Sequence, residues 1–136
     1  MKAKNTHTFL TAILLSWIAV FSLPAFAYNV GDQIFANTKE GIKLRFTITS
    51  LSPKECEVGQ YDREISGVPT IPENVEGFSV TKIANSGFGG CKYLTSIIIP
   101  KSVKNIGVSA FDYCLSLTSI TIPNSVTNIE ENAFDN

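Results

Sequence analysis

Histidine and tryptophan are almost absent from this 136-residue sequence, and both occur only near the N-terminus. The one histidine is His7 and the one tryptophan is Trp17. Without a further imidazole, the main body of the chain cannot build Ser-His-Asp or Cys-His catalysis, nor a His-ligated zinc site. We therefore expect no catalytic residue, no metal site and no cofactor, and the protein is predicted not to be an enzyme.

Other patterns that would indicate a specific chemistry are missing too. The 11 basic and 12 acidic residues form no Lys/Arg stripe, so no nucleic-acid partner is expected. The sequence has no Asp-x-Asp-x-Asp-Gly calcium loop, and glycines 87, 89 and 90 lack the Lys-Ser/Thr of a phosphate loop. Paired carboxylates can hydrolyse glycosides. The carboxylates within residues 55–64 follow no pattern that would fix two of them across a cleft. We therefore interpret them as part of a solvated face.

The first 27 residues have the pattern of a secretory signal peptide. Lys2 and Lys4 give a positive start, residues 9–23 form an uncharged and mostly apolar run, and the Ala-x-Ala frame at 25–27 predicts cleavage before Tyr28. The run is short for a membrane span of about 20 residues. We therefore expect no membrane span after cleavage, and a secreted, extracellular or cell-surface protein. Cleavage would also remove the histidine and the tryptophan.

The second half of the chain repeats itself at a fixed interval. Residues 94–111 recur as residues 117–134, 23 positions later, with every apolar position and both prolines matched. Cys91 matches Cys114 at the same interval, and the substitutions fall between the apolar positions. A fixed period of this length indicates a solenoid, in which each repeat forms one coil and stability depends on neighbouring coils.

Within each repeat, alternation predicts a strand whose isoleucines point inward. Ile120 and Ile122 are separated by one residue, so they share a face. Pro123 follows and ends the strand pairing because proline has no N–H. Val126 and Ile129 then return to the same interior from the other side of the coil. We expect parallel strands on the concave side and short turns or extended pieces on the convex side.

These features divide the chain into a signal peptide at 1–27, a β lead-in at 28–64 and a solenoid at 65–136, with coils at 65–93, 94–116 and 117–136. The lead-in alternates over residues 41–49 and has turn residues at 52–55. This pattern predicts an N-terminal β-hairpin cap over the open apolar end of the first coil.

Two irregularities interrupt the repeats. Five extra residues, 76–80, have turn composition and predict a small protruding loop. Asn136 falls inside a repeat, so the last coil is truncated. Either the chain is a fragment of a longer one, which we favour, or its last coil is uncapped and prone to self-association.

The pattern Leu-x-x-Ile-x-Ile-Pro, then Val-x-x-Ile, then Ala-Phe-x-x-Cys resembles the BspA-like leucine-rich repeats of bacterial surface and secreted proteins. The resemblance covers Ile65 to Asn136. It implies a mostly β or α-β solenoid, a leucine-rich-repeat right-handed superhelix with 23-residue coils. It also implies an extracellular protein-binding module, since some family members act in adhesion to host extracellular matrix.

Cysteine use leaves two alternatives open. Cys91 and Cys114 lie one coil apart, and strands of adjacent coils are about 4.8 Å apart, which a disulfide can span. The same repeat position points inward, where cysteine acts as a small hydrophobe, so two buried thiols are the other alternative. Cys56 is unpaired in both. No histidine is available to activate a thiolate, so a catalytic cysteine is not expected.

The outward side chains of the repeat strands form the predicted binding face. They are Thr70, Ser96, Ile98, Ser119 and Thr121. Ser and Thr would also suit a solvated polar ladder, whereas an exposed isoleucine suits a protein contact. The sequence therefore predicts a module that binds an extracellular protein or other macromolecule, with adhesion as one such role. The alternative is a structural spacer or assembly segment of a longer envelope protein.

Overall fold

A computed structural model describes residues 27–135 of the chain. The predicted signal peptide, apart from Ala27, lies outside the described residues. Nine strands and no helix occur in the described part. The sequence prediction of a mostly β solenoid is confirmed.

The N-terminal part is an antiparallel meander. It consists of β1 (Gln33–Asn37), β2 (Lys43–Leu51) and β3 (Lys54–Gln60), with β2 paired to both neighbours. Period-two alternation in β2 places three side chains in the core: Leu44, Phe46 and Ile48. The hairpin expected around residues 52–55 is therefore present, and its first strand begins and ends two residues later than the alternation at 41–49, while β1 was not predicted.

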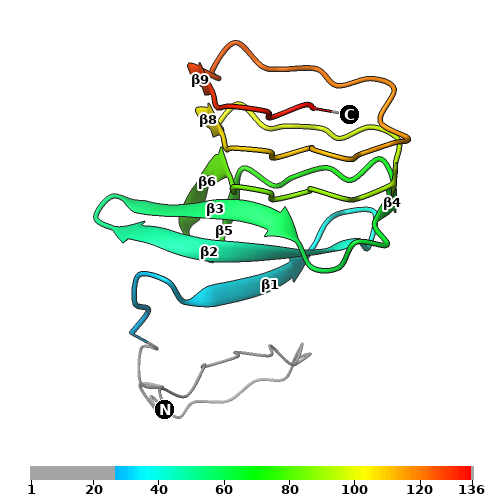
Figure 1. The fold of residues 1–136 in the computed structure, drawn as a ribbon. Coiled ribbons are helices and arrows are strands. Elements are labelled where there is room, and N and C mark those ends of the chain that lie inside the picture. Colours follow the sequence, from blue (N-terminus) through cyan, green and yellow to red (C-terminus); the bar gives the residue numbers. More distant parts are fainter. Residues whose placement is uncertain (1–26, 136) are drawn as a thin grey trace, which may run out of the picture.

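This meander continues directly into the first coil of the solenoid. β3 pairs in parallel with β6 (Phe78–Ile83), and Cys56 of β3 lies opposite Val80 of β6. Both side chains are fully buried. The lead-in and the repeats therefore share one sheet and one core, and the meander covers the N-terminal end of the coils (Figure 1).

The inserted residues 76–80 do not form a protruding loop, so that prediction is wrong. β5 (Asn74–Val75) pairs antiparallel with β6, and the two-residue turn Glu76-Gly77 connects them. Both turn residues have positive φ, 50° and 83°, as the tightest hairpin turns require. Phe78 and Val80 are buried, so the insertion enlarges the core.

Adjacent coils pair along three rows. The first row joins β4 (Ser66–Gly67) to β7 (Tyr93–Leu94), and the second joins β6, β8 (Asn105–Ile106) and β9 (Asn128–Ile129) in parallel. The third is a line of single parallel bridges from Thr70 to Ile98 to Thr121. Figure 1 shows the coils stacked in sequence order, with β6, β8 and β9 in one column.

The position of the regular pairing differs from the expectation. A continuous strand was expected over the isoleucine alternation at 97–99, but pairing there is a single bridge at Ile98. Prolines at 69, 72 and 100 flank this row, and each removes an N–H donor from the ladder. Ile97 and Ile99 still point into the core, with 2% and 7% exposure. The direction of the side chains was predicted correctly, whereas the extent of the strand was not.

A ladder of phenylalanines runs through the interior of the coils. The rings of Phe88 and Phe111 stack at 5.5 Å and 6°, and those of Phe111 and Phe134 at 5.3 Å and 7°. Equivalent positions thus occupy equivalent places in successive coils. The last coil differs because its outer side is open: Ile129 is 49% exposed, whereas its partner Ile106 in the preceding coil is fully buried.

Candidate functional site

The predicted binding residues lie together on one face, which we call the Ile98 face. It follows the row of bridges from coil to coil. Ile98 is 48% exposed at its centre, Ser119 and Thr121 are exposed, and Thr70 and Ser96 are half-buried. The structure therefore brings all five predicted residues to one surface: Thr70, Ser96, Ile98, Ser119 and Thr121.

Hydrogen bonds to the first coil fix the backbone at Ile98. Its N–H donates to the carbonyl of Pro69 and its carbonyl accepts from the N–H of Ile71, both at 3.0 Å. Its two neighbours along the chain, Ile97 and Ile99, are anchored in the core. The Ile98 side chain is thus held outward by a backbone that has little freedom to move.

One end of the face is closed by a carboxylate that the sequence analysis did not identify. Glu40 lies in the turn between β1 and β2, and it accepts hydrogen bonds from the backbone N–H of Thr70 at 3.0 Å and from its hydroxyl at 2.7 Å. The carboxylate therefore occupies the edge of the first coil, where no earlier coil supplies a carbonyl. Thirty residues separate the partners, and no local sequence signal links them.

The charge of Glu40 is stabilised by these contacts. Desolvation raises the pKa of its carboxyl group, but hydrogen bonds from the backbone and hydroxyl of Thr70, and from Thr38, outweigh it and lower the pKa to about 2. Glu40 engages both donor groups of Thr70. The part of the face that remains available for a ligand therefore comprises Ile98, Ser119 and Thr121.

The structure adds an apolar residue to the face. Val68 is 42% exposed and lies two residues before Thr70, with the buried Pro69 between them, so alternation places it on the same side. Val68 was not predicted as part of the face because the repeat pattern becomes clear only from Ile71 onward. Val68 and Ile98 give the face two exposed apolar side chains among hydroxyl groups.

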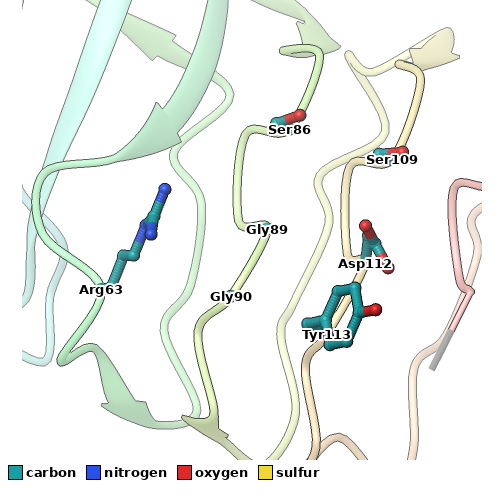
Figure 2. Close-up of a pocket in the computed structure, with 7 residues that line it drawn as sticks. All are labelled: Arg63, Ser86, Gly89, Gly90, Ser109, Asp112 and Tyr113. Atoms are coloured by element: carbon teal, nitrogen blue, oxygen red, sulfur yellow. The ribbon is translucent and has the colours of Figure 1, made fainter.

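A separate hollow of about 350 Å³ lies on another part of the coils. It is lined by Arg63, Ser86, Gly89, Gly90, Ser109, Asp112 and Tyr113. Figure 2 shows Arg63 on one side, Asp112 and Tyr113 on the other, and the backbone of the two glycines between them. In the sequence, these glycines lack the Lys-Ser/Thr of a phosphate loop, and no pattern there indicates the hollow.

All three cysteines are free and buried. Burial, followed by the charge of Glu57, raises the pKa of Cys56 to about 12. Burial also raises the pKa of Cys91 to about 12, with smaller contributions from Cys114 and Asp62. Of the two alternatives for the coil cysteines, the structure has the buried thiols, and the Cys114 thiol donates to the carbonyl of Phe88 at 3.1 Å.

The remaining chemistry of the described part is limited. Within residues 27–135, no group of three or more His, Cys, Asp and Glu side chains is arranged to hold a metal ion. No helix in this same range has the length and hydropathy needed to span a membrane.

Comparison with known proteins defines the class of the fold. Residues 70–136 match the family model described as the BspA type leucine rich repeat region, which comprises six copies of the repeat. Residues 70–136 of this chain are therefore leucine-rich repeats of the BspA type, as the repeat pattern indicated. No protein with a curated description matches the sequence.

Solved structures show the same fold. A leucine-rich repeat protein from Bacteroides capillosus is similar with a TM-score of 0.62 and 27% identity, over 75% of this chain and 73% of that one. The leucine rich repeat protein of T. pallidum is similar with a TM-score of 0.56 and 23% identity, over 76% of this chain. The matched part spans 42% of the T. pallidum protein, so that protein is considerably longer.

Proposed function

We propose that this protein is a secreted or cell-surface recognition module that binds an extracellular protein, without catalysis, through the Ile98 face. The proposal is supported by membership of a repeat family whose members are typically surface or secreted interaction modules. The observation that carries it is the outward position of Ile98, a large apolar side chain 48% exposed at the centre of a rigid face.

The composition of the face suits a protein contact. Val68 and Ile98 provide an apolar centre, and Ser96, Ser119 and Thr121 provide hydroxyl groups around it. An interface with an apolar core and a polar rim has this arrangement. Because the backbone is already fixed by inter-coil hydrogen bonds, binding would order few groups and so lose little conformational entropy.

Neither the Ile98 face nor the buried core offers much to catalysis. The Glu40 carboxyl group is already hydrogen-bonded to Thr70, and the raised pKa values of the buried thiols keep them protonated at neutral pH. Recognition is therefore the activity that the geometry supports best.

The test is a binding screen with a matched pair of variants. The protein is passed over a panel of purified extracellular-matrix proteins, and Ile98→Asp is compared with Leu115→Asp. Leu115 is 70% exposed and lies outside the bridged row that the Ile98 face follows. We expect Ile98→Asp to lose binding while both variants keep the melting temperature of the parent. Equal binding by both variants would exclude the Ile98 face.

A second candidate function is that of a spacer or assembly unit, and the open side of the last coil favours it. The apolar side chains of the last coil are only partly covered, and these are Ile120, Ile122, Val126 and Ile129. The equivalent side chains one coil earlier are buried, and these are Ile97, Ile99, Val103 and Ile106. Stacking of another coil or of a second copy on this side would bury them.

Sedimentation equilibrium tests this second candidate directly. Association that rises with protein concentration, and that Ile129→Lys abolishes, is the expected result. A monomer at every concentration would rule out self-assembly through this side.

A further inference from the structure

We propose that the hollow between Arg63 and the Asp112-Tyr113 pair binds a neutral pyranose unit of a glycan. This site is distinct from the Ile98 face, because it is built on the turns at 86–90 and 109–113 and not on the bridged segments. Its volume of about 350 Å³ lies at the small end of the range of ligand sites.

The hollow exists because one coil lacks side chains that the next coil has. Gly89 and Gly90 stand at the repeat positions that Asp112 and Tyr113 occupy 23 residues later. In Figure 2 the bare backbone of the two glycines forms the floor between the side chain of Arg63 and those of Asp112 and Tyr113. The space is therefore a feature of this one junction between coils.

The backbone conformation favours glycine at position 90 but does not require it. Gly90 has a φ of 76°, and the equivalent Tyr113 has a φ of 55°, so the repeat accepts a tyrosine in the same left-handed conformation. A Cβ on Gly90 would meet the Arg63 side chain only at ordinary contact distances of 3.6 and 3.8 Å. A side chain can thus be accommodated here, and its absence leaves the floor open.

The floor of the hollow is held in place by hydrogen bonds between the two coils. The N–H of Gly90 donates to the carbonyl of Asp112 at 2.7 Å, and that of Ser86 to the carbonyl of Val108 at 2.8 Å. The stacked rings of Phe88 and Phe111 lie in the interior under the same two turns. The backbone that forms the floor of the hollow is therefore fixed before a ligand binds.

The polar groups of the hollow are available for a ligand. Among residues 27–135 the ion pairs within 4 Å are Lys39–Glu40 and Lys82–Glu130, so the Arg63 guanidinium and the Asp112 carboxylate are not neutralised. A guanidinium only donates hydrogen bonds and a carboxylate only accepts them. Each sugar hydroxyl does both, so vicinal hydroxyls can be held between these two groups, with the hydroxyls of Ser86 and Ser109 nearby.

Tyr113 supplies the apolar wall that a sugar ring needs. Its side chain is 67% exposed at the rim of the hollow. One face of a pyranose carries C–H bonds, whose partial positive charge is attracted to the negative face of an aromatic ring. A wall of this kind beside paired donors and acceptors matches a neutral sugar more closely than other small ligands.

The alternatives fit less well. A phosphate would be attracted to Arg63 and repelled by Asp112 at the opposite wall. A peptide bound in extended form needs free backbone donors and acceptors. Here the backbone N–H groups of Ser86, Gly89 and Gly90 are already bonded within or between the coils.

The test is an NMR titration of the 15N-labelled protein with the methyl glycosides of glucose, galactose, mannose and N-acetylglucosamine. We expect saturable shifts at millimolar concentrations of at least one glycoside, confined to the amides of residues 63, 86–90 and 109–113. Inorganic phosphate and a short neutral peptide serve as competing probes. No saturable shift with any glycoside, or tighter binding of phosphate or peptide, would overturn the assignment.

Four variants localise the site. Gly90→Tyr fills the hollow with the residue that the next coil already has, and it should abolish binding. Tyr113→Ala and Asp112→Asn should each weaken binding roughly tenfold. Tyr93→Ala is the matched control, because Tyr93 is 47% exposed and does not line the hollow. Should Gly90→Tyr fail to fold, Tyr113→Ala decides: unchanged binding in it, or equal loss in Tyr93→Ala, contradicts the proposal.

Discussion

The loss of stability caused by removing one ring from the phenylalanine ladder should depend on the coil to which that ring belongs. Phe111 is fully buried between the rings of Phe88 and Phe134. Substitution of a buried Phe by Ala costs about 3–5 kcal/mol, which includes the cavity left behind. Phe134 is partly buried and stacks on one ring only, so we expect Phe134→Ala to cost about half as much.

The assay is urea unfolding followed by far-UV circular dichroism, with the midpoint and slope measured for each variant. Because the free energy of unfolding of a domain is only about 5–15 kcal/mol, Phe111→Ala can leave too little folded protein to measure. Phe111→Leu then serves as the milder variant, with an expected loss of about 1 kcal/mol. Equal losses for Phe111→Ala and Phe134→Ala would refute the argument that burial comes from neighbouring coils.

Three further predictions concern pH, packing and thiol reactivity. Because the pKa of Glu40 is lowered from 4.5 to about 2 in the folded state, its contribution to stability is complete above pH 4.5 and is lost as the pH falls towards 2. The free energy of unfolding should therefore decline less steeply over this range in Glu40→Gln than in the parent, and equal slopes would contradict the assignment. Gly107→Ala should lower the free energy of unfolding by about 1–3 kcal/mol through overpacking, because a Cβ there would lie 2.8 Å from the backbone nitrogen of Asn85. Thermal unfolding measures this loss, and Glu130→Ala, at the equivalent position of the next coil, is the control. A thiol reagent should react slowly with the native protein at neutral pH and with three cysteines after denaturation, whereas a single reactive thiol would indicate a Cys91–Cys114 disulfide.

The sequence predicts the coils well where the repeat is regular. Alternation of Ile97 and Ile99 gave the correct inward direction, because a period of two fixes which face is buried whatever the length of the strand. The extent of pairing was not predicted correctly. The flanking prolines limit pairing in the Ile97–Ile99 segment to a single bridge at Ile98. Strand β8 was not predicted because its two residues are too few to show alternation. β1 was missed because only Ile34 of its five residues is buried.

The candidate sites depend on contacts that the sequence does not display. Thr70 and Ile98 were identified from alternation, but Glu40 contacts Thr70 across 30 residues through a turn whose position follows from the meander. The hollow exists because Gly89 and Gly90 have no side chains. The two glycines contribute to a site only because the neighbouring coil places Asp112 and Tyr113 beside them. A pattern search reads the residues that are present, so it does not find such a space.

Native-state hydrogen exchange of the backbone amides tests the stacked-coil account most directly. In the second coil, the N–H of Lys104 donates to Thr81 and that of Gly107 to Ile83, while Thr127 and Glu130 of the last coil donate in the same way to the second. We predict strong protection of the Lys104 and Gly107 amides and weaker protection of the Thr127 and Glu130 amides, because the last coil is covered on one side only. Exchange at Lys104 and Gly107 as fast as in an unstructured peptide would contradict the account.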